Sequence, residues 1–94
     1  MRTKPVGLEV SVSARQDGTL EALYIRLTNR KIARTKEIVQ DQVLADYDSK
    51  GDLVGIEVLA PVKLSTLSRL VAPPKRKTFN KVLRQAAPEE LVLT

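Results

Sequence analysis

The sequence predicts an α+β fold: an antiparallel β-meander of about five strands, followed by one or two short C-terminal helices. Apolar and polar residues alternate in short segments between residues 8 and 59, as in strands with one buried face. Beyond Pro61 the apolar residues recur at helical spacing instead. We therefore expect residues 1–62 to form a β-meander domain. Residues 63–94 are expected to form a basic helical extension that packs on the sheet or projects from it.

The first two predicted strands share a simple pattern. Residues 8–13 alternate apolar and polar side chains, and Asp17-Gly18 then predicts a turn. In the next strand Leu23, Ile25 and Leu27 alternate with polar side chains, so the three aliphatic residues share one face.

Three further strands are predicted after a polar turn at residues 28–31. Residues 32–39 carry several charges, which is typical of a strand at a sheet edge. Residues 44–48 and 53–59 form a hairpin, and Gly51 supplies the positive φ angle that a loop of this length needs.

Two helices are predicted in the C-terminal third. Leucines and valine recur at helical spacing from Leu64 to Val71, and Pro73-Pro74 is expected to end this helix. Thr78 is expected to cap a second, amphipathic helix. For residues 88–93 the sequence leaves two alternatives, a further helical turn or a short strand.

Composition excludes several classes of function. The chain has 94 residues, the length of a single domain, and contains neither cysteine nor histidine. It therefore lacks disulfides, thiolate chemistry, the usual zinc, copper and iron ligands and the usual general base near neutral pH. No apolar run is long enough to span a bilayer, and the N-terminus lacks the hydrophobic segment of a signal peptide. A cytoplasmic protein with an aliphatic core is expected.

Charge is distributed unevenly along the chain. Residues 1–62 hold nine basic and nine acidic side chains, whereas residues 63–94 hold seven basic and two acidic ones. Such a basic segment attracts nucleic-acid phosphates or an acidic protein surface. The candidate phosphate-binding residues are Lys75, Arg76, Lys77, Lys81 and Arg84.

The predicted hairpin also fits part of a calcium-loop pattern. The matching residues are Asp46, Asp48, Lys50, Gly51, Leu53 and Glu57. A lysine at a ligand position and strands in place of helices on both sides favour a plain hairpin. We expect the carboxylates of Asp46, Asp48 and Glu57 to form an exposed face, paired with Arg26, Arg34 or Lys36 on neighbouring strands. No metal, cofactor or catalytic residue is predicted.

Residues 20–60 resemble a family of small prokaryotic proteins, DUF2283, whose function is unknown. The segments Ala22-Leu23-Tyr24-Ile25-Arg26-Leu27 and Gly55-Ile56-Glu57-Val58-Leu59 carry the resemblance. It implies a short β-meander followed by helix, with no catalytic residue and no cofactor. Some genes of this family neighbour RelE-like ribonuclease toxins, so the resemblance also implies an antitoxin-like role. Residues beyond about 62 fall outside the shared region.

The sequence therefore favours a non-enzymatic, protein-binding regulatory module of antitoxin-like type, acting as a homodimer. The apolar residues expected to enter a groove of a toxin-like partner are Leu67, Leu70, Phe79, Val82 and Leu83. The same residues would equally serve to cap the sheet. The alternative function is a nucleic-acid-binding regulator that uses the basic tail. The roles of Tyr24, Arg26, Asp46 and Glu57 stay open.

Overall fold

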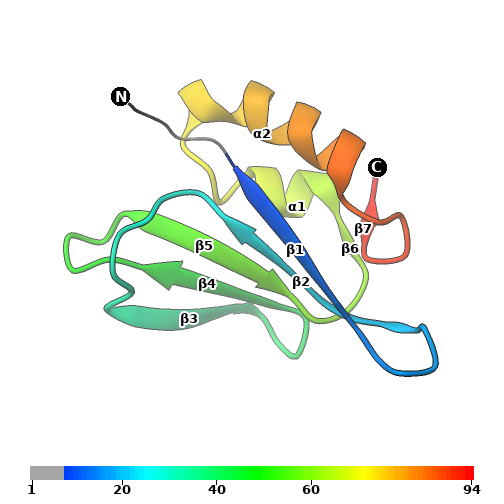
Figure 1. The fold of residues 1–94 in the computed structure, drawn as a ribbon. Coiled ribbons are helices and arrows are strands. Elements are labelled where there is room, and N and C mark those ends of the chain that lie inside the picture. Colours follow the sequence, from blue (N-terminus) through cyan, green and yellow to red (C-terminus); the bar gives the residue numbers. More distant parts are fainter. Residues whose placement is uncertain (1–7) are drawn as a thin grey trace, which may run out of the picture.

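The computed structural model describes residues 8–94, which form a five-stranded antiparallel sheet with helices on one face (Figure 1). The strands of the sheet are β1 (Glu9–Ala14), β2 (Leu20–Arg26), β3 (Arg34–Val39), β4 (Val43–Tyr47) and β5 (Leu53–Val58). The helices are α1 (Leu64–Ser68) and α2 (Pro73–Ala86), and the short strands β6 (Val62–Lys63) and β7 (Val92–Leu93) pair in parallel. The predicted α+β fold is confirmed. The first seven residues of the predicted 1–62 unit, including the segment expected to lack a signal peptide, lie outside the described residues.

The strand order β1-β2-β5-β4-β3 departs from that of a simple meander. The segment 27–33 includes the polar turn predicted at residues 28–31 and carries the chain past the ends of β5 and β4 to the far edge of the sheet, so residues 32 and 33, predicted to begin the third strand, lie outside β3. The N–H of Leu27 donates to the carbonyl of Val54, and the N–H of Ala33 donates to that of Tyr47, each at 2.8 Å. The charged strand β3 lies at a sheet edge, as its sequence predicts.

Positive φ angles shape the tight turns. Gly18 follows β1 with a φ of 92°, and Gly51 lies between β4 and β5 with a φ of 88°, so both predicted glycine turns are present. Between β3 and β4 the same region is occupied by Asp41, whose φ is 60°. Aspartate tolerates this conformation better than most residues, and the N–H of Asp41 donates to the Glu37 carboxylate at 3.1 Å.

The core lies between the sheet and the helices. Leu23 and Ile25 of β2 and Ile56 of β5 are fully buried, and Leu67 of α1 and Phe79 of α2 belong to the same cluster. Apart from Phe79, the buried apolar side chains of the described part are aliphatic, as the composition predicts. The C-terminal segment therefore packs on the sheet and shares its core.

The prolines open a helix, where the sequence analysis expected them to close one. α2 begins at Pro73, with Pro74 at its second position, and α1 already ends at Ser68. The first N–H groups of a helix have no partner within it, so proline loses no hydrogen bond there. Thr78, predicted as the cap, lies exposed inside α2, and Ala72 takes the N-cap position.

Of the two alternatives left open for residues 88–93, the structure contains the short strand, β7. β7 pairs with β6 through Val92 opposite Val62 and Leu93 opposite Lys63. The N–H of Val62 also donates to the Leu91 carbonyl at 3.0 Å. Leu91 and Val92 are buried in the core, so this short parallel pair holds the end of the chain beside the helices. Within residues 8–94 no helix is both long and apolar enough to cross a lipid bilayer.

Candidate functional site

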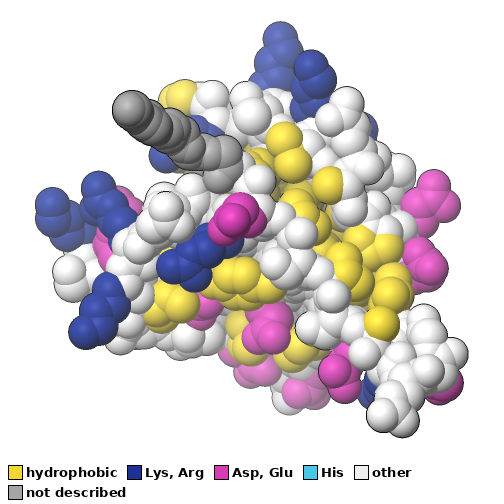
Figure 2. All heavy atoms as spheres, in the orientation of Figure 1, with side chains coloured by type: hydrophobic (Ala, Val, Ile, Leu, Met, Phe, Trp, Pro, Cys, Tyr) yellow, Lys and Arg dark blue, Asp and Glu magenta, His cyan; other side chains and the backbone are white. Residues whose placement is uncertain are grey.

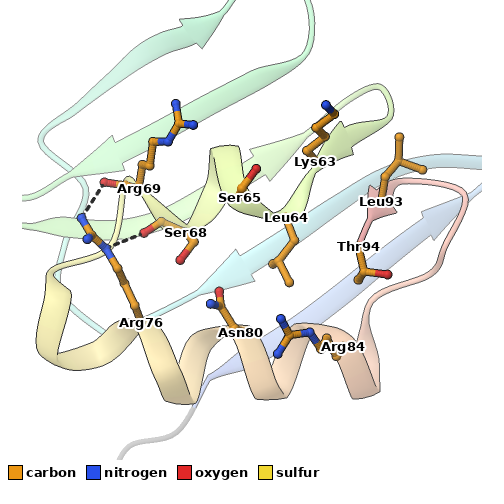
Figure 3. Close-up of a pocket in the computed structure, with 10 residues that line it drawn as sticks. All are labelled: Lys63, Leu64, Ser65, Ser68, Arg69, Arg76, Asn80, Arg84, Leu93 and Thr94. Carbon is orange, nitrogen blue, oxygen red and sulfur yellow. Dashed lines mark hydrogen bonds between the residues drawn. The ribbon is translucent and has the colours of Figure 1, made fainter.

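A groove of about 580 Å³ lies between α1, α2 and the β6–β7 pair. Figure 3 shows it in close-up. Its lining residues are Lys63, Leu64, Ser65, Ser68, Arg69, Arg76, Asn80, Arg84, Leu93 and Thr94. Four of these carry a positive charge and none carries an acidic side chain. We call this feature the α1–α2 groove.

Arg76 closes one end of the α1–α2 groove. Its Nε donates to the carbonyls of Val71 at 2.8 Å and Ser68 at 3.0 Å, and one terminal nitrogen donates to that of Arg69 at 3.4 Å. The carbonyls at the end of a helix lack partners within it, so the guanidinium caps α1 and fastens it to α2. Arg76 is therefore a structural cation, and its predicted phosphate-binding role would compete with these bonds.

Asn80 and Arg84 continue the flank that Arg76 begins, at successive intervals of four residues. In Figure 3 the Asn80 side chain points from α2 toward α1, and the Arg84 side chain lies along α2 beside it. The Asn80 Oδ1 atom is buried and has no hydrogen-bond partner among the described residues. An unpaired buried amide oxygen costs free energy, and this atom is closed off from a molecule in the groove.

The exposed cations of α2 lie on two sides of the helix. We call α1 and α2 together the helical layer. Lys77, Lys81 and Arg84 share the outward side of α2 because they are four and then three residues apart. Lys75 lies on the opposite flank, beside the small apolar pocket that Pro74 and Phe79 help to line. The structure therefore places three of the five predicted phosphate-binding residues, Lys77, Lys81 and Arg84, on one exposed side of α2 and Lys75 on the opposite flank, while Arg76 lines the α1–α2 groove with Arg84.

No ion pair within residues 8–94 involves a basic residue of the C-terminal segment; the pairs there are Arg15–Glu21, Arg30–Asp48 and Arg30–Asp52. Lys63 and Arg69 extend from β6 and α1 away from α2 (Figure 3). The helical layer therefore carries positive charge that no described acidic side chain neutralises.

The apolar residues predicted to contact a partner lie mostly in the core. Leu67, Phe79 and Leu83 are at most 1% exposed and belong to the core cluster, and Leu70 and Val82 are half-buried. Their position agrees with the alternative interpretation, in which these apolar residues cover the sheet. A partner could reach the first three only if the helices left the sheet.

A second polar cluster lies on the face of the sheet opposite the helices. The Tyr24 hydroxyl donates to Asp46 Oδ2 at 2.7 Å, and the Thr35 hydroxyl donates to Asp46 Oδ1 at 2.6 Å. The Tyr24 ring reaches Asp46 by crossing over Gly55, the residue paired with Asp46 on β5. The sequence leaves the roles of Tyr24 and Asp46 open, because Tyr24, Thr35 and Asp46 come from three strands and nothing in the local pattern joins them.

Asp48 stabilises the β4–β5 hairpin and connects it to segment 27–33, which passes the ends of β5 and β4 and is called the crossing segment below. Its Oδ1 accepts the N–H groups of Lys50 and Asp52, each at 2.9 Å, and its Oδ2 accepts from the Arg30 guanidinium at 3.1 Å. The Asp52 N–H, followed by the Lys50 N–H and Arg30, lowers the pKa of Asp48 below its ordinary value. These bonds occupy both carboxylate oxygens, which are used to fix the loop.

The predicted carboxylate pairing was wrong in two respects. Asp46 and Asp48 are 9% and 5% exposed, so they do not form an exposed face. Among the described residues, the cation that pairs with Asp48 is Arg30, and none of Arg26, Arg34 and Lys36 forms an ion pair. The crossing segment brings Arg30 to the hairpin.

The residues that fit part of a calcium-loop pattern lie in the β4–β5 hairpin. Both flanks of this pattern are strands, as the hairpin prediction requires.

Tyr24 should make stability depend on alkaline pH. Burial and the hydrogen bond to Asp46 raise the pKa of Tyr24 from 10.0 to about 12. The folded state thus holds the phenol proton more tightly than the unfolded chain. The resulting stabilisation is complete below pH 10.0 and is lost as the pH rises toward 12.

We expect the difference in free energy of unfolding between wild type and Tyr24→Phe to shrink between pH 10.0 and 12 in denaturant titrations. A Tyr47→Phe variant serves as control, and a difference independent of pH would contradict the assignment.

Comparison with known proteins finds a similarity over one segment of the chain. No curated protein and no solved structure matches the chain. Residues 17–60 match the family described as Protein of unknown function (DUF2283), which confirms the resemblance found in the sequence. The match spans β2 to β5 and includes Tyr24, Asp46 and Gly55, whereas the α1–α2 groove lies beyond it. Over residues 17–60 the chain is therefore similar to the DUF2283 family, and α1, α2 and the α1–α2 groove lie outside the matched segment.

Proposed function

We propose that this protein is a non-enzymatic binding module of the cytoplasm that regulates a protein partner in an antitoxin-like manner. The observation that carries the proposal is the α1–α2 groove, which lies within a helical layer of unpaired cations. Cations attract an acidic partner over a distance and orient it as it approaches. The groove then offers a concave contact surface on rigid elements.

The lining of the groove defines the chemistry of the partner segment. Leu93, which is 47% exposed, supplies apolar surface. Arg84 supplies a cation for a carboxylate. An acidic peptide segment with an aliphatic side chain provides both complements, a carboxylate and an apolar group. A nucleic acid supplies phosphates but no aliphatic side chain for the groove.

Titration calorimetry with a synthetic peptide tests the proposal. The probe is a short peptide of glutamate and leucine residues, and its counterpart has glutamine in place of each glutamate. We expect saturable binding of the acidic peptide only. Arg84→Gln should weaken binding about ten- to hundredfold, because a hydrogen bond to a charged group contributes roughly 1.5–3 kcal/mol.

Lys50→Gln is the matched control, since Lys50 is an exposed cation in the β4–β5 hairpin and its replacement changes net charge equally. Equal weakening by both substitutions would indicate diffuse attraction and would contradict binding in the groove. The absence of saturable binding to the acidic peptide would contradict the proposal as a whole.

A nucleic-acid-binding regulator is the second candidate, and the stripe of Lys77, Lys81 and Arg84 favours it. Three phosphate contacts on duplex DNA would give a slope of about −2.7 for the logarithm of the binding constant against that of salt concentration. Gel shifts at several salt concentrations, with wild type and with all three residues changed to glutamine, separate the two functions. A slope near −2.7 that the triple variant abolishes would favour nucleic acid over an acidic protein.

A further inference from the structure

The two edges of the five-stranded sheet differ in how they are protected from further pairing. β3 forms one edge and carries Arg34, Lys36 and Glu37, charges of the kind that discourage strand addition. β1 forms the other edge and has a single charged residue, Glu9, at its start. Within residues 8–94 no strand pairs with the outer side of β1 (Figure 1).

The side of β1 that faces the helices is apolar and incompletely covered. Val10 and Val12 lie opposite Ile25 and Leu23, the core residues of β2, so all four side chains share the helix-covered face. Val12 is nevertheless 46% exposed. Figure 2 shows hydrophobic side chains gathered between the helical layer and this edge of the sheet. An apolar row therefore reaches the open edge without a charged residue among its members.

The register of β1 makes the strand complementary to itself. A bulge between Ser13 and Ala14 limits regular pairing to Glu9–Ser13, and Ser11 is the centre of this segment. When two copies pair antiparallel about Ser11, Val10 lies opposite Val12 of the partner subunit and Glu9 lies opposite Ser13 of the partner subunit. Apolar side chains then meet apolar ones, and no like charges face each other.

We propose that β1 is a dimer interface through which two copies of this chain form one continuous ten-stranded sheet. The two-fold axis passes through Ser11, and both helical layers lie on the same side of the joined sheet. Pairing supplies partners for the free backbone groups of the edge and covers Val12. The interface uses neither α1 nor α2, so it leaves the α1–α2 groove free.

Sedimentation velocity over a range of protein concentrations tests the interface. Wild type should dimerise, and Val12→Lys should weaken the dimer about tenfold or more, because it places a charge in the apolar row. Ile32→Lys is the matched control: Ile32 is 40% exposed outside the sheet, so this variant should dimerise like wild type. Circular dichroism checks that each variant is folded. A wild type that stays monomeric, or a Val12→Lys dimer as tight as wild type, would overturn the proposal.

Charges placed on the other face of β1 test the register. Ser13→Lys should tighten the dimer about two- to thirtyfold, because each new lysine faces Glu9 of the partner subunit. Ser11→Lys should weaken it, since the two introduced lysines then face each other across the axis. A dimer tightened by Ser11→Lys would overturn the axis through Ser11, because that result requires the introduced lysine to face Glu9 of the partner subunit.

Discussion

Replacing Phe79 with alanine should destabilise the whole domain by about 3–5 kcal/mol. Phe79 is 1% exposed and packs in the cluster that α2 shares with the sheet. Its removal leaves a cavity that the aliphatic neighbours fill only in part. Domains of this size are stable by roughly 5–15 kcal/mol, so the variant should lose a large share of its stability. Equilibrium unfolding in urea, followed by circular dichroism, measures the change.

Two further variants make the Phe79 result specific. Phe79→Leu retains most of the apolar volume and should cost less than about 1.5 kcal/mol. Thr78→Ala changes the neighbouring exposed residue of α2 and should stay within about 0.5 kcal/mol of wild type. If Phe79→Ala left the unfolding of the sheet unchanged, the helices would be an independent appendage and the shared core would be refuted.

Substitution of Gly55 by alanine should also be strongly destabilising. A Cβ atom at Gly55 would overlap the Tyr24 hydroxyl and would lie 2.6 Å from the ring carbon Cζ. The ring would have to move and would lose its hydrogen bond to Asp46. We expect overpacking to cost about 1–3 kcal/mol, and the lost bond to a charged group to cost roughly 1.5 kcal/mol more. Thermal unfolding and denaturant titration both measure this loss.

A double-mutant cycle identifies the cause of the Gly55 effect. In a Tyr24→Ala background the added methyl group meets no ring, so Gly55→Ala should cost far less there than in wild type. Residues in direct contact show coupling energies of roughly 0.5–3 kcal/mol. Equal costs in the two backgrounds would mean that the glycine is required for its backbone conformation and not for the passage of the Tyr24 ring.

Local patterns predicted the strands and their exposed edge well. Alternation at Leu23 and Ile25 identified the buried face of β2, and the charges of β3 indicated an edge position. These features depend on neighbours in the sequence, since side chains alternate along a strand. The hairpin with Gly51 was predicted for the same reason: a positive φ angle is a local requirement.

Helix boundaries were predicted less well because one residue type has two meanings. Proline ends a helix when it falls inside it, but it is favoured in the first turn. Pro73 and Pro74 open α2, and the chain between Ser68 and Ala72 provides the break. Likewise, the spacing of Leu67, Phe79 and Leu83 predicted an apolar face, but periodicity does not say whether that face meets the sheet or a partner.

The sequence by itself determined the fold class, the basic C-terminal segment and the absence of cysteine and histidine chemistry. Tertiary structure alone decided the strand order and the meeting of Tyr24, Thr35 and Asp46. It also decided that Arg76 caps α1 and that Lys75 lies away from the α1–α2 groove. The physical reason is the separation of the interacting residues along the sequence, because propensity and periodicity depend only on residues that are close in sequence. The partner of a strand, a carboxylate or a guanidinium is set by packing between segments far apart along the chain.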